Sequence, residues 1–118
     1  MRNKVQKGRC KKLSLDGFEE VVKTYDELQL AAAKFLSSNR DFVDCQCNVE
    51  SCTIDDTKYT TDFVAKDKGG KLTAFECVQR KNLTKPKTVR MLDESQRFWC
   101  ARGIEWGLIL DKEGGTDE

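Results

Sequence analysis

The sequence contains no histidine, a single proline and no long apolar run. The absence of histidine excludes every mechanism that needs imidazole as a general base or a metal ligand. No segment approaches the roughly 18 consecutive apolar residues of a membrane-spanning helix, and no apolar stretch follows the basic N-terminal residues as in a secretion signal. We therefore expect an intracellular, cytoplasmic protein with no membrane partner. Any catalysis must use carboxylates, lysines, thiols or a metal ion.

The length of 118 residues, with 38% hydrophobic and 35% charged positions, predicts one compact domain with a modest core. The spacing of Leu28 and Phe35 behind a capping Asp26 indicates a helix, and Gly69 and Gly70 indicate a tight hairpin turn. The predicted elements are helices over 26–37 and 88–101 and strands over 42–47, 49–54, 59–65, 72–80 and 104–110. This order predicts an α/β domain with a mixed β-sheet flanked by helices.

The net charge is only +1, but the basic residues are unevenly distributed. Residues 1–12 hold six basic side chains and no acid, residues 77–92 hold five and no acid, and the chain is acidic from Asp111 onward. One face of a nearly neutral molecule would therefore attract phosphate. The alternative is an ordinary solvated surface.

Six cysteines in a chain without a secretion signal are expected to be reduced thiols, ligands or small core residues. Cys45, Cys47 and Cys52 form a C-x-C-x4-C pattern that needs a fourth thiolate, such as Cys10, to hold a structural zinc ion. The alternative, which we favour, is a set of independent, partly buried thiols.

Alternation along the second hairpin strand predicts that Gln79 and Lys81 point to the same side, with Asp62 brought near them by the partner strand. Mg²⁺ or Mn²⁺ prefers oxygen ligands, which Asp62, the Gln79 amide and the Arg80 backbone carbonyl would supply together with water and a substrate phosphate. Lys81 would then orient the attacking water or offset charge on the phosphate. The alternative is that Lys81 is merely exposed beyond the strand and Asp62 forms a salt bridge near the turn.

Several segments occur in the order and spacing of a known family. They are Tyr59-Thr60-Thr61-Asp62-Phe63, Val78-Gln79-Arg80-Lys81, Gln96-Arg97-Phe98-Trp99, Gly103-Ile104-Glu105-Trp106-Gly107 and Asp111-Lys112-Glu113. Over residues 25–113 the chain resembles the TnsA endonucleases, subunits of heteromeric cut-and-paste transposases. Their N-terminal domain belongs to the PD-(D/E)xK nuclease superfamily. The resemblance implies a single restriction-endonuclease-like domain and a metal-dependent DNA endonuclease that hydrolyses phosphodiester bonds.

The resemblance also implies roles for particular residues. Asp62 matches the metal-binding aspartate, Gln79 the glutamine of Q-x-K, and Lys81 the catalytic lysine. Glu27 is the best match for an additional acidic catalytic and metal-binding residue on the preceding helix, with Glu19 and Glu20 as alternatives. Glu76 is interpreted as structural, because alternation points it away from Lys81. The implied partners are DNA, a recombinase subunit and a regulatory ATPase, and a homodimer is left open.

A basic segment follows the second hairpin strand directly and ends where a helix N-terminus would add amide donors for phosphate. The residues predicted to contact DNA are Arg80, Thr84, Lys85, Lys87, Thr88 and Arg90. Phe98, Trp99 and Trp106 are expected to pack in the core rather than to stack on bases, because they follow the apolar pattern of their elements.

The expected organisation is a basic arm and lead-in over residues 1–24, the nuclease domain over 25–113 and an acidic tail over 114–118. TnsA proteins continue into a C-terminal domain that contacts the ATPase and DNA, whereas this sequence stops soon after Glu113. A stand-alone nuclease of the same fold, from a bacterium, phage or other mobile element, is therefore an alternative. A second alternative is a nuclease-fold module that binds DNA or protein without cutting.

Overall fold

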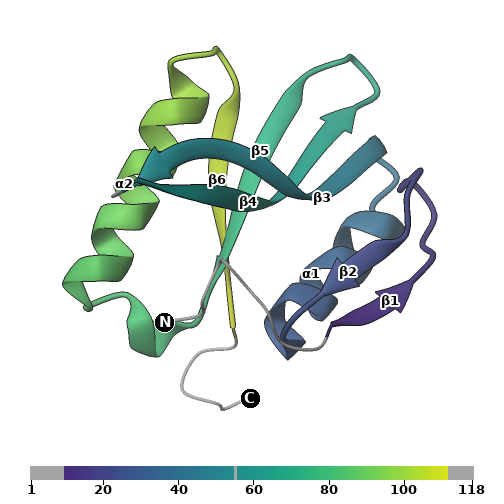
Figure 1. The fold of residues 1–118 in the computed structure, drawn as a ribbon. Coiled ribbons are helices and arrows are strands. Elements are labelled where there is room, and N and C mark those ends of the chain that lie inside the picture. The colour runs from purple at the N-terminus through teal and green to yellow at the C-terminus, as the bar shows by residue number, and fades with distance from the viewer. Residues whose placement is uncertain (1–9, 55, 112–118) are drawn as a thin grey trace.

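A four-stranded sheet with one helix on each face forms the body of the protein, as Figure 1 shows. The computed structural model describes residues 10–54 and 56–111. Asp55, most of the basic arm (residues 1–9) and the acidic tail lie outside the described residues. The elements are β1 (Lys11–Leu13), β2 (Val22–Thr24), α1 (Glu27–Ser38), β3 (Phe42–Ile54), β4 (Thr57–Asp67), β5 (Leu72–Val78), the 3₁₀ helix η1 (Arg80–Asn82), α2 (Pro86–Cys100) and β6 (Glu105–Leu110).

The strand order is β3-β4-β5-β6, in which the first two pairings are antiparallel and β5 pairs with β6 in parallel. A parallel pair needs a crossover connection, and α2 supplies it. The prediction of a mixed sheet flanked by helices is thus confirmed. Gly70, at φ +87°, forms the β4–β5 turn as predicted. The two strands expected over 42–54 are one continuous strand, β3, which is irregular at Asn48 (φ +53°).

The two faces of the sheet bury different residues. On the α1 side, Leu36 of the helix packs with Phe63 of β4 and Cys77 of β5. On the α2 side, Trp99 packs with Val64 and Ala74. Phe63 and Ala74 are completely buried. Alternation along β4 and β5 therefore sorts side chains between two separate cores.

The N-terminal strands β1 and β2 form a small antiparallel sheet beside α1 (Figure 1). Val22 of β2 is completely buried in the α1-side core. Residues 11–24, predicted as part of an arm and lead-in, thus contribute to the packing of the domain. The capped start of α1 is confirmed, because the Asp26 side chain accepts the Gln29 N–H at 2.8 Å.

Candidate functional site

Asp62 lies in the middle of β4 at the point where the strand separates from β5. The β4–β5 ladder begins at the pair Phe63–Phe75 and does not extend back to Asp62. Instead, Asp62 Oδ2 accepts the backbone N–H of Cys77 at 2.7 Å. Only 2% of Asp62 is exposed. The Asp62 carboxylate therefore replaces a backbone carbonyl as the acceptor for the Cys77 N–H of β5. A hydrogen bond to a carboxylate is stronger than one to a neutral acceptor.

Helix α1 contacts this carboxylate through Gln29. Gln29 Nε2 donates to Asp62 Oδ1 at 3.1 Å and to Asn48 Oδ1 at 3.0 Å, while Oε1 accepts the Tyr25 N–H at 2.8 Å. Gln29 is 1% exposed. Asn48 of β3 lies opposite Asp62 of β4, because the residues on either side of them are paired in the sheet. Asn48 Nδ2 also donates to the Lys23 carbonyl at 2.9 Å. We call Gln29, Asn48 and Asp62 the α1-side polar cluster.

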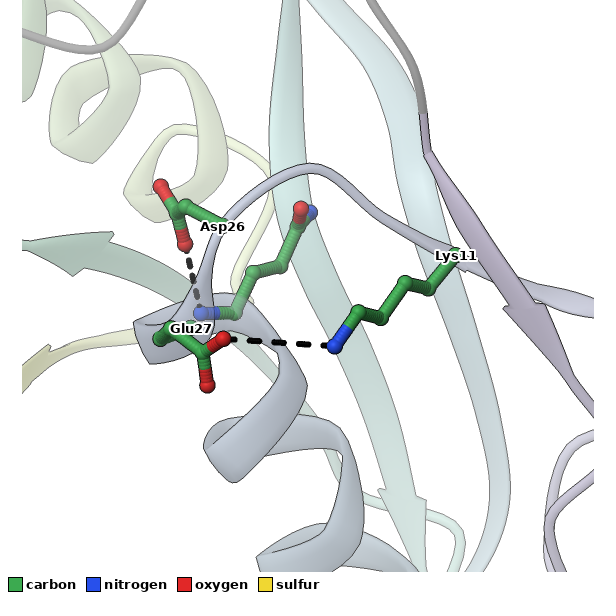
Figure 2. A network of polar contacts seen from close by, with 4 residues as sticks. Lys11, Asp26 and Glu27 are labelled. Carbon is green, nitrogen blue, oxygen red and sulfur yellow. Dashed lines mark hydrogen bonds and ion pairs between the residues drawn. The ribbon is translucent and has the colours of Figure 1, made fainter.

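The structure does not bring Glu27, the predicted acidic member of the site, to Asp62. The side chain of Glu27 is 90% exposed, and its Oε2 lies 3.9 Å from Lys11 Nζ. Figure 2 shows the two side chains pointing toward each other. Successive helical residues are rotated by about 100°, so positions 27 and 29 differ by about 200° and face opposite directions. Gln29 occupies the inward position that the sequence analysis assigned to a carboxylate. A local pattern could have indicated this position. The side chain of the third residue after a capping residue commonly bonds a backbone N–H at the start of the helix, and Gln29 stands three residues after Asp26.

Gln79 and Lys81 do not share a strand, and the parity argument that aligned them was wrong. Strand β5 ends at Val78, and Lys81 belongs to η1, where it is exposed. The Gln79 carbonyl accepts the Asn82 N–H at 2.9 Å. The Arg80 carbonyl, predicted to bind a metal ion, accepts the Leu83 N–H at 3.1 Å. This segment turns away from extended geometry directly after the sheet.

The end of β5 is fixed by Asp111, which follows β6. Asp111 Oδ1 accepts the Arg80 N–H at 2.7 Å, and the Asp111 carbonyl accepts Arg80 Nε at 2.8 Å. Arg80, a predicted DNA contact, therefore has its backbone and Nε engaged within the protein. The aspartate matched to the family's terminal motif thus holds the turn that begins the basic segment.

Glu76 lies on the α2 face of the sheet, together with Ala74, as alternation along β5 predicts, whereas Asp62 meets α1 on the other face. Glu76 is completely buried, and its Oε2 accepts the Ser95 hydroxyl at 2.6 Å. Ser95 Oγ in turn accepts Trp106 Nε1–H at 3.0 Å. Trp99 is 7% exposed and donates Nε1–H to Thr61 Oγ1 at 2.8 Å. These contacts confirm that Trp99 is a core residue. In both tryptophans the indole N–H donates to a hydroxyl group of the protein.

Replacing Ser95 by alanine is expected to lower the free energy of unfolding by about 2 kcal/mol. The variant removes a donor from the completely buried Glu76 and an acceptor from the half-buried Trp106, so each of them loses one partner. Urea denaturation followed by circular dichroism measures the change. Ser38→Ala is the matched control, because Ser38 is exposed and its hydroxyl donates only to the nearby Phe35 carbonyl. A Ser95→Ala variant as stable as Ser38→Ala would contradict the structural interpretation of Glu76.

The basic segment, which covers residues 80–90, is largely accessible. Thr84, Lys85, Lys87 and Arg90 are exposed. Thr88 is completely buried, so its predicted role as a DNA contact is wrong in this conformation. Helix α2 begins at Pro86 with no acidic residue in its first turn and no side-chain capping bond from Lys85. The helix start and its lysines thus place positive charge together on one surface.

The cysteines do not assemble as the zinc pattern requires. All six cysteines lie within the described residues and none forms a disulfide, and Cys45 and Cys47 lie in the α1-side core. Burial, helped by Asp44, raises the pKa of Cys45 to about 11. Burial also raises the pKa of Cys52, with smaller contributions from Glu94 and Glu76 on the α2 side.

Within residues 10–54 and 56–111, no group of three or more histidine, cysteine, aspartate or glutamate side chains is placed to hold a metal ion. Asp62 has the right chemistry for Mg²⁺ or Mn²⁺. Glu27 and the Arg80 carbonyl are engaged elsewhere. The predicted ligands as a set therefore do not fit a preformed metal centre.

A cavity of about 260 Å³ lies along β3 and is lined by Phe18, Glu19, Glu20 and residues 44–49, which include Asn48 of the α1-side polar cluster. Glu19 and Glu20, the alternative acidic candidates, are thus placed at this cavity.

No protein-family model matches this chain, and no curated protein is significantly similar to it in sequence. In the described part of the chain, no helix is long and apolar enough to cross a membrane.

Proposed function

We propose that this chain is a DNA endonuclease of the TnsA-like type, which hydrolyses phosphodiester bonds with Mg²⁺ or Mn²⁺. The observation that carries the proposal is the position of Asp62. Its carboxylate lies on β4, an inner strand of a mixed sheet flanked by helices. It is bonded there to α1 and to β5. A mixed sheet flanked by helices is compatible with a restriction-endonuclease-like domain, and the basic segment begins directly after β5.

The roles of the chain's own residues follow from their positions. Asp62 is the carboxylate on which the site is centred, and Lys81, exposed on η1, supplies a cation near the end of the same sheet. Lys85, Lys87 and Arg90 bind the DNA backbone without reading its sequence. When bound, a divalent cation would activate water and neutralise phosphate charge. The predicted ligands do not form a preformed metal centre in the described residues. A recombinase subunit and a regulatory ATPase are the partners that the resemblance suggests.

A second candidate is a nuclease-fold module that binds DNA without cutting. The observation that favours it is that both carboxylate oxygens of Asp62 already accept internal hydrogen bonds. For this candidate, the role of Asp62 is to stabilise the fold through its hydrogen bonds, and the basic segment binds DNA.

Plasmid cleavage separates the two candidates. We expect the purified chain to nick or linearise DNA with Mg²⁺ or Mn²⁺ and to be inactive with excess chelator. Ca²⁺ should support binding without turnover, because it fills oxygen sites with looser geometry. Lys81→Ala should abolish cleavage and leave the fold intact, since the side chain is exposed. DNA binding without cleavage under every metal condition would support the second candidate, and cleavage in excess chelator would exclude the metal mechanism.

A further inference from the structure

The cavity of about 260 Å³ lies between β3 and the loop that leads into β2. Two hydrogen bonds hold this loop against the strand, since Cys45 N–H donates to the Gly17 carbonyl at 2.7 Å and Asn48 Nδ2 donates to the Lys23 carbonyl at 2.9 Å. Between these points β3 has only residues 46 and 47, whereas the loop has residues 18–22. An extended chain advances about 3.3 Å per residue, so the longer segment must bow away from the strand. The bowed loop and the strand form the walls of the cavity.

The strand side of the cavity is an open sheet edge. Strand β3 is the first of the sheet, so β4 pairs with one of its edges only. On the other edge, the described residues form one isolated bridge, between Phe18 and Cys45. Because the Cys45 N–H points to this outer edge and backbone groups alternate along a strand, Cys47 turns its N–H and carbonyl to the same edge. The cavity thus has backbone hydrogen-bonding groups in its wall.

The walls also carry negative charge and apolar surface. Glu19 and Glu20 are exposed and Asp44 is half-buried, and none of the three forms an ion pair with another described residue. Phe18 and Val49 contribute apolar surface. None of the described residues that line the cavity is basic. The lining therefore complements a ligand that combines a cationic head with an aliphatic stem.

We infer that this cavity receives an arginine side chain from a partner protein. A guanidinium group is planar and has five N–H donors, which suits a site with several carboxylates and a backbone carbonyl. The aliphatic stem of the arginine lies against the apolar part of the wall, as such stems commonly do. This inference goes beyond the proposed function and does not depend on whether the chain cuts DNA.

The surroundings of the cavity favour a protein as the source of the arginine. Val21 and Val43 stand next to the lining residues Glu20 and Asp44 in the chain, and they are 49% and 51% exposed. Arginine anchors at protein interfaces fill pockets whose neighbouring contacts exclude water, and exposed valines supply such contacts.

The position of the cavity in the sheet is compatible with simultaneous DNA binding. Residues 45–47 pair with residues 63–65 of β4, which pair in turn with residues 73–75 in the first half of β5. The basic segment follows the opposite end of β5. A protein bound at the cavity would therefore leave the basic segment accessible.

The test is a titration of the ¹⁵N-labelled full chain, followed by NMR, with two capped amino acids. The probes are acetyl-arginine amide and acetyl-citrulline amide, which have nearly the same shape but differ in charge. We expect the arginine probe to shift the amide signals of Glu19, Gln46 and Cys47 saturably. The citrulline probe should bind at least about ten-fold more weakly, because charge-assisted hydrogen bonds are lost. Equal affinity of the two probes, or no saturable shift at these residues, would overturn the inference.

Paired variants test the carboxylates. Glu19→Gln combined with Glu20→Gln should weaken binding of the arginine probe at least about ten-fold, because two charged acceptors become neutral. The matched control combines Asp56→Asn with Asp93→Asn, which makes the same change in net charge at exposed positions outside the lining. The control should bind the probe as the wild type does, and the NMR spectrum of each variant reports its fold. An equal loss of affinity in both pairs would refute a specific site.

Two further titrations separate a partner protein from other sources of the cation. Free L-arginine that binds at least ten-fold more tightly than the capped probe would indicate a small-molecule site and would overturn the proposal of a protein partner. Replacement of Arg2, Lys4, Lys7 and Arg9 by glutamine should leave the affinity for the capped probe unchanged. If the capped probe binds only after that replacement, the cavity belongs to the chain's own N-terminal residues, and the inference of a partner is wrong.

Discussion

Asp62→Ala is expected to lower the free energy of unfolding by about 3 to 4 kcal/mol, because a buried carboxylate that serves two donors is removed. The variant leaves the Cys77 N–H without this acceptor and Gln29 Nε2 with Asn48 only. It also opens a gap between α1 and the sheet. For a domain of this size, the midpoint of thermal unfolding should fall by roughly 10 °C or more.

The control for this variant is Asp93→Ala. Asp93 pairs with Arg97 on the exposed surface of α2, at 3.2 Å, with half or more of each side chain in solvent. Its loss should cost less than about 1 kcal/mol, as for other exposed ion pairs. Circular dichroism with urea measures both variants. An Asp62→Ala variant as stable as Asp93→Ala would mean that the carboxylate is not part of the interior.

The expected instability of Asp62→Ala bears on how activity is interpreted. Loss of cleavage in that variant follows equally from an unfolded chain and from a missing catalytic group. Lys81→Ala is the better test of chemistry, because it changes an exposed side chain on η1. A stably folded Lys81→Ala protein that binds DNA and does not cut it would separate catalysis from folding.

The second large effect is expected for DNA binding. Replacing Lys85, Lys87 and Arg90 together by alanine should weaken binding to unrelated duplex sequences to a similar extent. Each phosphate contact releases counterions and contributes about 0.9 to the slope of log affinity against log salt, so the slope should flatten by about two to three units. The fold should persist because all three residues are exposed. Fluorescence anisotropy over a salt series in EDTA measures binding without cleavage.

The matched control is a triple variant with the same change in net charge at Lys34, Lys66 and Lys68. These lysines are exposed on α1 and at the β4–β5 hairpin, whereas the basic segment follows the opposite end of β5. Their replacement should change the slope by less than about one unit if the DNA lies on the basic segment. Equal effects of the two triples would indicate a nonspecific response to net charge, and an unchanged slope in the first would place the DNA on another face.

Most secondary structure could be predicted because its signals are local. The capping bond from Asp26 lies within one helical turn, and the φ of Gly70 is a property of one residue. Alternation along β5 separated Glu76 from Cys77 correctly, since both lie inside the strand. The short strands β1 and β2 were missed, because three-residue strands carry almost no periodic signal.

The candidate site could be predicted only in part. Asp62 was found from its segment, and its burial follows from its place in β4. The helix residue that meets it is Gln29, whereas the resemblance had matched Glu27 to the family's additional acidic residue, and Glu27 lies in solvent beside Lys11. Thr88 was placed on the DNA side by residue type, although helix rotation buries it. The type of a residue shows which contacts its side chain could make, but the rotation of the helix decides whether that side chain faces the interior or the solvent.

By itself, the sequence determined the helices, the hairpin and the separation of the two cores, because capping, turn conformation and alternation act over a few residues. Only the tertiary structure decided that Gln29 meets Asp62, since this depends on how α1 is rotated against the sheet. It also decided that β5 ends before Lys81. The Arg80 N–H is taken by Asp111, which is 31 residues further along the chain, and no local pattern specifies a contact at that distance.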